Sequence, residues 1–278
     1  MKARELLAML GVRPPRKTYP YEVVTFDLPR DGTVQYAQWL HPAETPKEVR
    51  QEQVDELRRF VTPGEVAIDI GAHTGDTAIP MALALGPAGC VLALEPNPYV
   101  FEVLRKNAEL NRGRATIVPL MFAATSQAGE FEFEYSDAGC CNGGRHEGIS
   151  RWRHGHAFTL KVRGENLQSY IAEHFPALAP RIRFLKVDAE GYDYQVLASL
   201  KEMIAAQRPY IRAEVYKLLR LEQRERLYDL FAELGYEVFL VESDECYLGA
   251  KLEKRDLMVR PQYDVFCIPK RPGLTVEG

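Results

Sequence analysis

The sequence predicts an α/β protein built on a doubly wound, mostly parallel sheet with an N-terminal extension. A β-branched run at residues 66–70 is followed by a glycine turn and by a helix of small and apolar residues at 77–85, the opening unit of a nucleotide-type α/β site. Strand-like and helix-like runs then alternate through the middle of the chain. Two strand-like runs close it, at 236–241 and 263–268.

The individual elements follow from composition and periodicity. The strand-like runs are rich in β-branched and aromatic residues, and they lie at 21–26, 66–70, 90–94, 117–123, 131–135, 157–162, 182–188, 209–215, 236–241 and 263–268. The helix-like runs carry one apolar stripe, and they lie at 45–60, 77–85, 98–111, 166–174, 192–206 and 222–234. Thr45, with Pro46 and Glu48 after it, is a typical helix start, and Gly235 is a typical helix end.

These elements predict an N-terminal extension over residues 1–44, a main α/β domain over 45–270 and a C-terminal tail over 271–278. We expect the extension to pack against this domain and to cover the mouth of its site. Residues 136–157 interrupt the regular pattern and are rich in glycine, polar residues and histidine. Such an insertion is typical of a substrate loop. Its candidate contacts are Asn142, Arg145, His146 and His154.

Composition narrows the class of protein. The 278 residues are 46% hydrophobic and 27% charged, as expected for a soluble globular protein. A net charge of −4 argues against a nucleic-acid partner. No run approaches the ~18 apolar residues of a membrane span, and residues 1–10 predict an amphipathic helix and not a secretory signal. The five cysteines form no C-x-x-C pair, so we expect reduced thiols and a cytoplasmic protein.

The turn after the first buried strand indicates the ligand. Gly71 and Gly75 enclose three residues, which is neither the G-x-G-x-x-G of a dinucleotide loop nor a P-loop. Asp69, at the strand end, repels a pyrophosphate but suits an ammonium group. Glu95, which ends the next strand, is placed to accept hydrogen bonds from two ribose hydroxyls. An ammonium group and a ribose without a phosphate describe S-adenosylmethionine.

Three segments resemble the FkbM family of S-adenosylmethionine-dependent methyltransferases. They are residues 69–76 (DIGAHTGD), 94–98 (LEPNP) and 184–192 (FLKVDAEGY), and the last of these is the most specific to the family. The resemblance covers about residues 61–268. It implies a Rossmann-like class I methyltransferase sheet in which the final strand lies antiparallel beside the sixth. It also implies methylation of a hydroxyl on a sugar, a lipid or a polyketide-type product.

The resemblance and the strand ends together give the candidate site. The predicted cofactor-binding residues share the carboxyl ends of the strands, and they are Asp69, Gly71, Ala72, His73, Thr74, Gly75, Glu95, Pro96, Asn97, Ala123 and Asp188. Asp188 and Glu190 are paired carboxylates, and repulsion between them would raise one pKa and give a general base that works near neutral pH. We favour Asp188 slightly, and Lys186 is expected to orient a carboxylate or the acceptor.

Other interpretations remain open at this point. Asp188, Glu190 and Glu214 are possible oxygen ligands of a divalent cation, although a metal is not favoured. His146, His154 and His156 are alternative bases if the insertion closes over the site. Glu95 would also suit the ribose of NAD in a dehydrogenase, and a non-catalytic cofactor-binding scaffold is the third alternative. The sequence names neither the methyl acceptor nor the oligomeric state.

Overall fold

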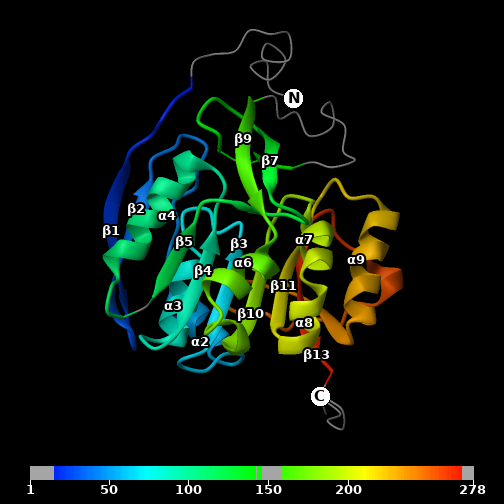
Figure 1. Ribbon diagram of the computed structural model, residues 1–278. Coiled ribbons are helices and arrows are strands. Elements are labelled where there is room, and N and C mark those ends of the chain that lie inside the picture. Colours follow the sequence, from blue (N-terminus) through cyan, green and yellow to red (C-terminus); the bar gives the residue numbers. More distant parts are fainter. Residues whose placement is uncertain (1–15, 115, 142, 146–157, 271–278) are drawn as a thin grey trace.

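The computed structural model describes residues 16–114, 116–141, 143–145 and 158–270 (Figure 1). The predicted helix at residues 1–10, the tail at 271–278 and most of the insertion at 136–157 lie outside the described residues. None of the helices within the described ranges is long and apolar enough to cross a membrane.

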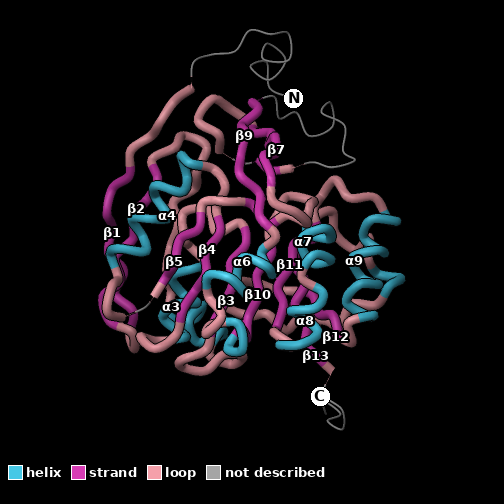
Figure 2. The backbone as a smooth tube through the Cα atoms, in the orientation of Figure 1, coloured by secondary structure: helices cyan, strands magenta, loops and turns pink. Residues whose placement is uncertain are grey.

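A seven-stranded mixed sheet lies at the centre of the molecule (Figure 2). The sequence predicts such a sheet, with most of its strands parallel. In spatial order its strands are β12 (Tyr236–Leu240), β13 (Tyr263–Pro269), β11 (Tyr210–Val215), β10 (Ile182–Val187), β3 (Val66–Ile70), β4 (Cys90–Leu94) and β5 (Ile117–Leu120). Strands β11, β10, β3, β4 and β5 pair in parallel. The last strand, β13, lies antiparallel between β11 and β12, so the expected antiparallel closing strand is confirmed.

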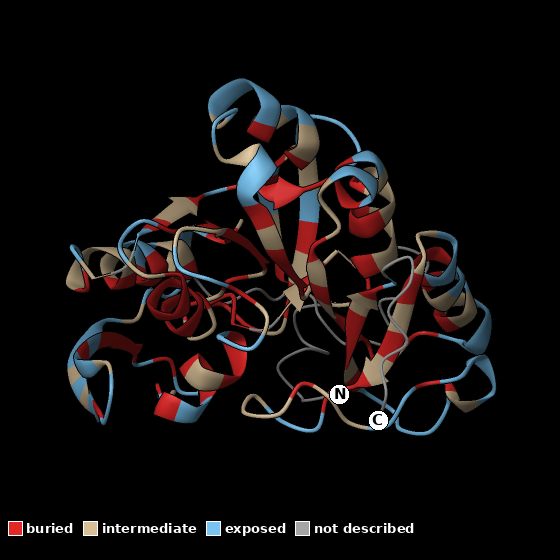
Figure 3. Cartoon of the chain, turned by 90° about the horizontal axis from the view of Figure 1, so that it is seen from below, coloured by how far each residue is buried: buried red, intermediate tan, exposed pale blue. Residues whose placement is uncertain are grey.

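Helices cover both faces of this sheet, because successive strand residues point to opposite faces. The helices are α2 (Gln51–Leu57), α3 (Ala78–Leu85), α4 (Pro98–Leu110), α6 (Leu167–His174), α7 (Asp193–Ser199), α8 (Lys201–Gln207) and α9 (Leu221–Glu233). Ile68 packs in one apolar cluster with α6, α7, α8 and α9, while its neighbour Ala67 packs in a second cluster with α2, α3 and α4. Buried residues accordingly concentrate on the strands and exposed residues on the outer helix surfaces (Figure 3).

A second, four-stranded sheet rises beyond the carboxyl ends of the parallel strands (Figure 1). Its order is β6 (Ala123–Ala124), β9 (Phe158–Glu165), β7 (Gly129–Tyr135) and β8 (Gly143–Gly144). Strands β7 and β9 pair antiparallel, with Tyr135 opposite Phe158, so the expected pairing of these two runs is confirmed. The predicted strand at 117–123 is divided, because β5 belongs to the central sheet and β6 to the second sheet.

The N-terminal segment forms a hairpin of β1 (Tyr21–Leu28) and β2 (Gly32–Trp39) beside α4 (Figure 1). Asn107 accepts a hydrogen bond from the Ala37 amide (2.6 Å) and donates one to its carbonyl (3.1 Å). Asn111 does the same for Gln35 (3.2 and 2.8 Å). One helical turn is about 5.4 Å and two strand residues about 6.7 Å, so two asparagines four residues apart can take the place of a neighbouring strand.

Two predicted helix boundaries are wrong. The helix expected to start at Thr45 begins at Gln51, and Gln53 accepts the amide of Arg50 at 2.9 Å where it starts. The preceding residues are held in an extended path because Gln38 donates to the Lys47 carbonyl and the Lys47 side chain pairs with acids. The helix expected over 192–206 is two helices, α7 and α8, which meet at Leu200.

Candidate active site

A cavity of about 330 Å³ lies at the carboxyl ends of the parallel strands, under the second sheet. The predicted site residues that line it are Gly71, His73, Glu95, Pro96, Asn97, Ala123, Lys186, Asp188 and Glu190. Asp69, Ala72 and Thr74 are buried close behind this lining. The fold therefore brings the ends of β3, β4 and β10 to one place, as the rule for open α/β sheets predicts, and β6 adds Ala123.

Backbone hydrogen bonds tie the turn after β3 to the end of β4. The amides of Gly71 and Ala72 both donate to the Leu94 carbonyl, at 3.1 and 2.9 Å. Gly71 has a φ of +76°, and a Cβ at this position would lie 2.1 Å from the carbonyl oxygen of Asp188. Only glycine tolerates both the positive φ and the close contact. Gly71 therefore lets the turn at residues 71–76, the predicted cofactor turn, approach the loop at residues 188–192 that follows β10 (the β10 loop).

Asp69 and Lys186 form an ionic pair beneath the cavity. Asp69 is fully buried and accepts a hydrogen bond from the Thr77 hydroxyl at 2.6 Å. The Lys186 ammonium makes three contacts of 3.4 Å each. Its partners are one carboxylate oxygen of Asp69, one carboxylate oxygen of Asp188 and the carbonyl oxygen of Gly71. Burial acts to lower the pKa of Lys186, but Asp69 and Asp188 outweigh it and raise that pKa. Lys186 therefore ties the cofactor turn to the β10 loop.

Glu95 is a buried carboxylate that faces the cavity from the end of β4. One of its oxygens accepts the His73 amide at 3.1 Å, and the other accepts the Asn97 amide at 2.8 Å. Burial raises the pKa of Glu95 to about 7, against these two amides, which act to lower it. Each oxygen retains a second lone pair, so the carboxylate can still accept two ligand hydroxyls.

Beyond Glu95 the cavity becomes apolar, with Val100, Phe122, Ala123 and Phe133 in its wall. Asn97 holds this end together, because its side chain accepts the Tyr99 amide at the start of α4 (3.0 Å) and donates to the Cys140 carbonyl (2.5 Å). This part of the wall would accommodate a flat, mostly apolar group.

The loop after β10 presents the two carboxylates in a fixed conformation. Glu190 lies in the left-handed region with a φ of +52°, and Gly191 follows with +99°. The buried carboxylate of Asp193 holds this loop by accepting the amides of Ala189 (3.2 Å) and Gly191 (3.1 Å). Burial and the neighbouring charge of Asp188 raise the pKa of Glu190 to about 7.

We expect Asp193→Ala to loosen the loop that carries Glu190. The substitution leaves two amides without their acceptor, which costs about 1–3 kcal/mol of unfolding free energy. Urea denaturation measures this loss. The exposed Asp229→Ala on α9, where Asp229 pairs only with Lys254 among the described residues, is the matched control and should change stability by less than about 0.5 kcal/mol. Equal stability of the two variants would contradict the role of Asp193.

Each of the three cations in the cavity wall is placed between two carboxylates. Lys186 lies between Asp69 and Asp188, as described above. Arg212 of β11 pairs with Asp264 (2.7 Å) and Asp244 (2.8 Å). Lys47 lies 3.2 Å from one carboxylate oxygen each of Glu44 and Asp76. The charged groups of the described wall are thus largely arranged in neutralising pairs, with acids in excess.

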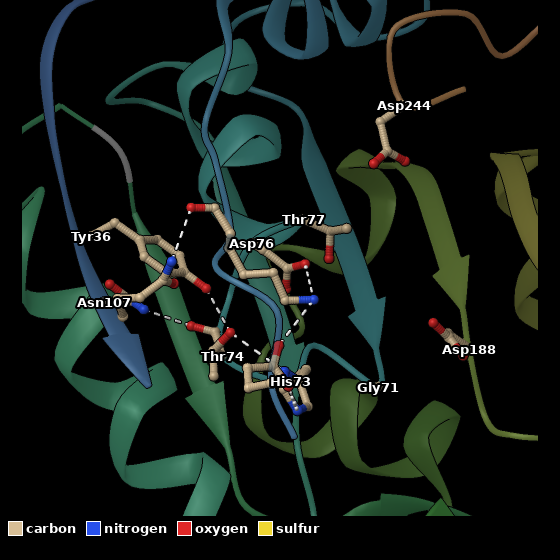
Figure 4. Close-up of polar contacts among 12 residues, drawn as sticks. Tyr36, Gly71, His73, Thr74, Asp76, Thr77, Asn107, Asp188 and Asp244 are labelled. Carbon is tan, nitrogen blue, oxygen red and sulfur yellow. Dashed lines mark hydrogen bonds and ion pairs between the residues drawn. The ribbon is translucent and has the colours of Figure 1, made fainter. Parts of the chain in front are cut away.

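The hairpin contacts the cofactor turn directly. The Tyr36 hydroxyl of β2 lies 2.6 Å from the Thr74 hydroxyl. The side-chain amide of Asn107 on α4, which also binds the hairpin, donates to the Thr74 carbonyl at 2.7 Å. The Trp39 ring lies 6.0 Å from the His73 ring. Figure 4 shows the turn with Tyr36 and Asn107 on one side and Asp188 and Asp244 on the other. The extension therefore supports one side of the candidate site.

Comparison with known proteins identifies the family. The family model described as the methyltransferase FkbM domain matches residues 69–238. The chain belongs to the FkbM methyltransferase family. No curated protein matches the chain significantly. Because the match begins at Asp69 and ends at Val238, the hairpin, Glu44, Lys47, Asp244 and Asp264 lie outside the FkbM domain.

Solved structures similar to this FkbM-family chain are distant in sequence. Methyltransferase FkbM from Methylobacillus flagellatus KT is 12% identical with a TM-score of 0.46, and the match covers 74% of this chain and 44% of that one. Aeropyrum pernix fibrillarin, solved with natively bound S-adenosyl-L-methionine, is 12% identical with a TM-score of 0.44, over 91% and 97%. An S-adenosylmethionine-dependent O-methyltransferase from Thermotoga maritima is 13% identical with a TM-score of 0.42, over 91% and 79%. The chain thus spans less than half the length of the Methylobacillus protein.

The predicted substrate-loop residues are only partly described in this FkbM-family structure. Asn142, His146 and His154 lie outside the described residues, as does His156. The guanidinium of Arg145 lies between the rings of Phe131 and Tyr192, 4.7 and 5.0 Å from their centres. Arg145 thus packs against the second sheet and the loop that carries Glu190.

Glu214, the third residue of the possible metal set, is buried at the end of β11 and accepts a hydrogen bond from Gln262. Burial and the nearby Asp188 raise its pKa to about 10. Among the described residues, no group of three His, Cys, Asp or Glu side chains is arranged to hold a metal ion.

Sequence reasoning missed several charged residues that support the site, among them Lys47, Asp193, Arg212, Asp244 and Asp264. Arg212 gave a signal, because a charge inside the apolar run 209–215 needs a partner when buried. Asp193 directly follows the family segment but has no pattern of its own. The others come from outside the FkbM domain, and no local spacing marks them.

Proposed function

We propose that this protein is a class I, S-adenosylmethionine-dependent O-methyltransferase that acts on a hydroxyl of a small molecule or a sugar. The observation that carries the proposal is the single cavity that joins Glu95, the Gly71 turn and the Asp188–Glu190 loop in a chain of the FkbM family. When bound, the cofactor supplies an activated methyl group for in-line transfer. The protein must align the acceptor and remove its proton.

The cofactor fits the wall by chemistry. Glu95 would accept both ribose hydroxyls through the lone pairs that its two backbone partners leave, and the apolar end around Phe122 and Ala123 would take the adenine. Asp69 would act indirectly, because its buried carboxylate holds Thr77 and Lys186 rather than facing the cavity. A dehydrogenase is less favoured, since the turn lacks the glycine pattern that receives a pyrophosphate.

Glu190 is the stronger of the two candidate bases. Asp188 is paired with the buried ammonium of Lys186. This ammonium would compete with the acceptor's proton for the oxygens of Asp188. Glu190 faces the cavity with a pKa of about 7, near the value at which a general base is most effective. In this proposal Glu190 takes the proton from the acceptor hydroxyl, and the neighbouring charge of Asp188 helps to raise the pKa of Glu190. The sequence alone slightly favours Asp188.

Calorimetric titration with S-adenosylhomocysteine, run beside NAD, tests the proposed cofactor. We expect saturable binding of S-adenosylhomocysteine, no binding of NAD, and about 10- to 100-fold weaker S-adenosylhomocysteine binding by Glu95→Ala, which lacks the acceptor for both hydroxyls. Glu109→Ala on the exposed side of α4 is the matched control and should bind normally. Binding of NAD alone would overturn the methyltransferase proposal in favour of a dehydrogenase.

A further inference from the structure

Lys47 is a cavity residue that the FkbM domain does not contain. It lies on the extended segment between the hairpin and α2, and it lines the cavity together with Glu44, His73 and Asp76. Its ammonium is 3.2 Å from Glu44 Oε1 and 3.2 Å from Asp76 Oδ2. Burial acts to lower the pKa of Lys47, but Asp76 and Glu44 outweigh it and raise that pKa, so the side chain is an ammonium.

Four backbone donors of the cofactor turn are already used. The amides of Gly71 and Ala72 donate to the Leu94 carbonyl, and the amide of Gly75 donates to the Ala72 carbonyl. The amide of His73 donates to Glu95. A ligand carboxylate that reaches this turn cannot bind these four amides, so an accessible side-chain cation nearby would supply a strong contact to it.

Accessibility decides among the three cations of the described wall. The side chains of Lys186 and Arg212 are only 6% and 11% exposed, whereas that of Lys47 is 31% exposed. An ammonium has three N–H donors, and two point to Glu44 and Asp76. Lys47 is therefore the cation best placed to direct a remaining donor at a ligand in the cavity.

Lys47 and Asp76 together form an accessible pair of opposite charges. The Asp76 side chain is 25% exposed and also lines the cavity. An α-amino acid carries a carboxylate and an ammonium on one carbon, and a cation beside an anion is complementary to that arrangement. Asp76 follows Gly71 by five residues, so the pair lies at the turn and not at the apolar end.

We propose that Lys47 binds the carboxylate of the cofactor's amino-acid group and that Asp76 accepts a hydrogen bond from its ammonium. This inference rests on the proposed S-adenosylmethionine binding and assigns one end of that ligand to a residue outside the FkbM domain. The extension holds Lys47 in place, because Gln38 at the end of β2 donates to the Lys47 carbonyl at 3.2 Å. The hairpin is then part of the cofactor site.

The test compares two ligands that differ in the amino-acid group. S-adenosylhomocysteine carries the carboxylate and the ammonium, and 5′-methylthioadenosine carries neither. Calorimetry on the full chain measures both affinities for the wild type, Lys47→Met and Lys47→Arg. Lys47→Met keeps the aliphatic stem and removes only the charge. Lys201→Met, at an exposed lysine on α8, is the matched control.

We expect Lys47→Met to bind S-adenosylhomocysteine about 10- to 100-fold more weakly while its affinity for 5′-methylthioadenosine changes by less than about 2-fold. Lys47→Arg should recover most of the loss, and Lys201→Met should match the wild type with both ligands. An unchanged S-adenosylhomocysteine affinity, or an equal loss with both ligands, would overturn the role of Lys47 and leave the proposed function standing. No binding of either ligand by the wild type would overturn the proposed function itself and the inference with it.

Discussion

Gly71→Ala is expected to abolish binding of S-adenosylhomocysteine and to destabilise the protein by more than about 3 kcal/mol. A Cβ at this position would lie 2.1 Å from the Asp188 carbonyl oxygen, which belongs to the backbone and cannot rotate away. The φ of +76° adds about 1–2 kcal/mol of strain for alanine. The two loops must separate, so the substitution disrupts the cofactor turn and moves the loop that carries Glu190.

A second glycine separates these two causes. Gly113 has a φ of +87°, but a Cβ there has no neighbour within 4 Å. Gly113→Ala should therefore cost only the backbone strain, about 1–2 kcal/mol, and should bind S-adenosylhomocysteine normally. Chemical denaturation and calorimetry measure both quantities. If Gly71→Ala were no less stable than Gly113→Ala and still bound the ligand, the close approach of the two loops would not be needed for the site.

Glu190→Gln is expected to lower kcat by about 10²- to 10⁴-fold, the usual contribution of a general base, with S-adenosylhomocysteine affinity unchanged. The amide keeps the shape of the side chain and removes its basicity. Asp188→Asn should lower kcat and also weaken cofactor binding, because Lys186, which contacts the Gly71 carbonyl, loses one of its two carboxylates. Glu130→Gln, at an exposed residue of β7, is the matched control. An Asp188→Asn variant that loses turnover while Glu190→Gln keeps it would reverse the two roles.

The pH profile gives a second measure of the same group. A base must be deprotonated to act, so at saturating cofactor kcat should rise tenfold per pH unit below about 7 and level off above it, following the pKa of Glu190. The folded-state pKa lies above the ordinary value of 4.5, so the folded state holds this proton more tightly than the unfolded state does. Stability from this group is therefore lost as pH rises from about 4.5 to 7. Glu190→Gln should remove that loss and raise the melting temperature at pH 8. A variant that melts below the wild type at that pH would contradict a buried Glu190 carboxylate with a raised pKa.

The sequence predicts most of the central fold because its signals are local. The run at 66–70 is apolar and β-branched, and it forms a strand buried on both faces. Strand-like runs that alternate with helices leave few topologies, and the resemblance to the FkbM family adds the antiparallel closing strand. The helix start predicted at Thr45 is wrong because tertiary contacts override the local signal. Its capping pattern is good, but Lys47 there makes contacts with Asp76 and Gln38 that hold the segment extended.

In the candidate site, the positions of the residues can be predicted from local signals, whereas their tasks cannot. The positions of Asp69, Gly71, Glu95, Asp188 and Glu190 are predictable, because each lies at or just beyond the end of a recognisable strand and parallel strands bring their carboxyl ends to one edge. Their separate tasks are not predictable. The burial of Asp69 behind Thr77 and Lys186, and the pKa of about 7 at Glu190, depend on the packing around each carboxylate.

The sequence by itself determined the α/β class, the succession of strands and helices along the chain, and the edge of the sheet that carries the site. Those properties depend on periodicity and on strand ends, which a chain displays over a few residues. Only the tertiary structure decided that the N-terminal hairpin supports the cofactor turn through Tyr36, and that Lys47 reaches the cavity. These contacts join residues 29 to 70 positions apart, such as Lys47 with Asp76 and Ala37 with Asn107. No local pattern encodes such pairs, because their geometry exists only after the sheet and its helices have packed.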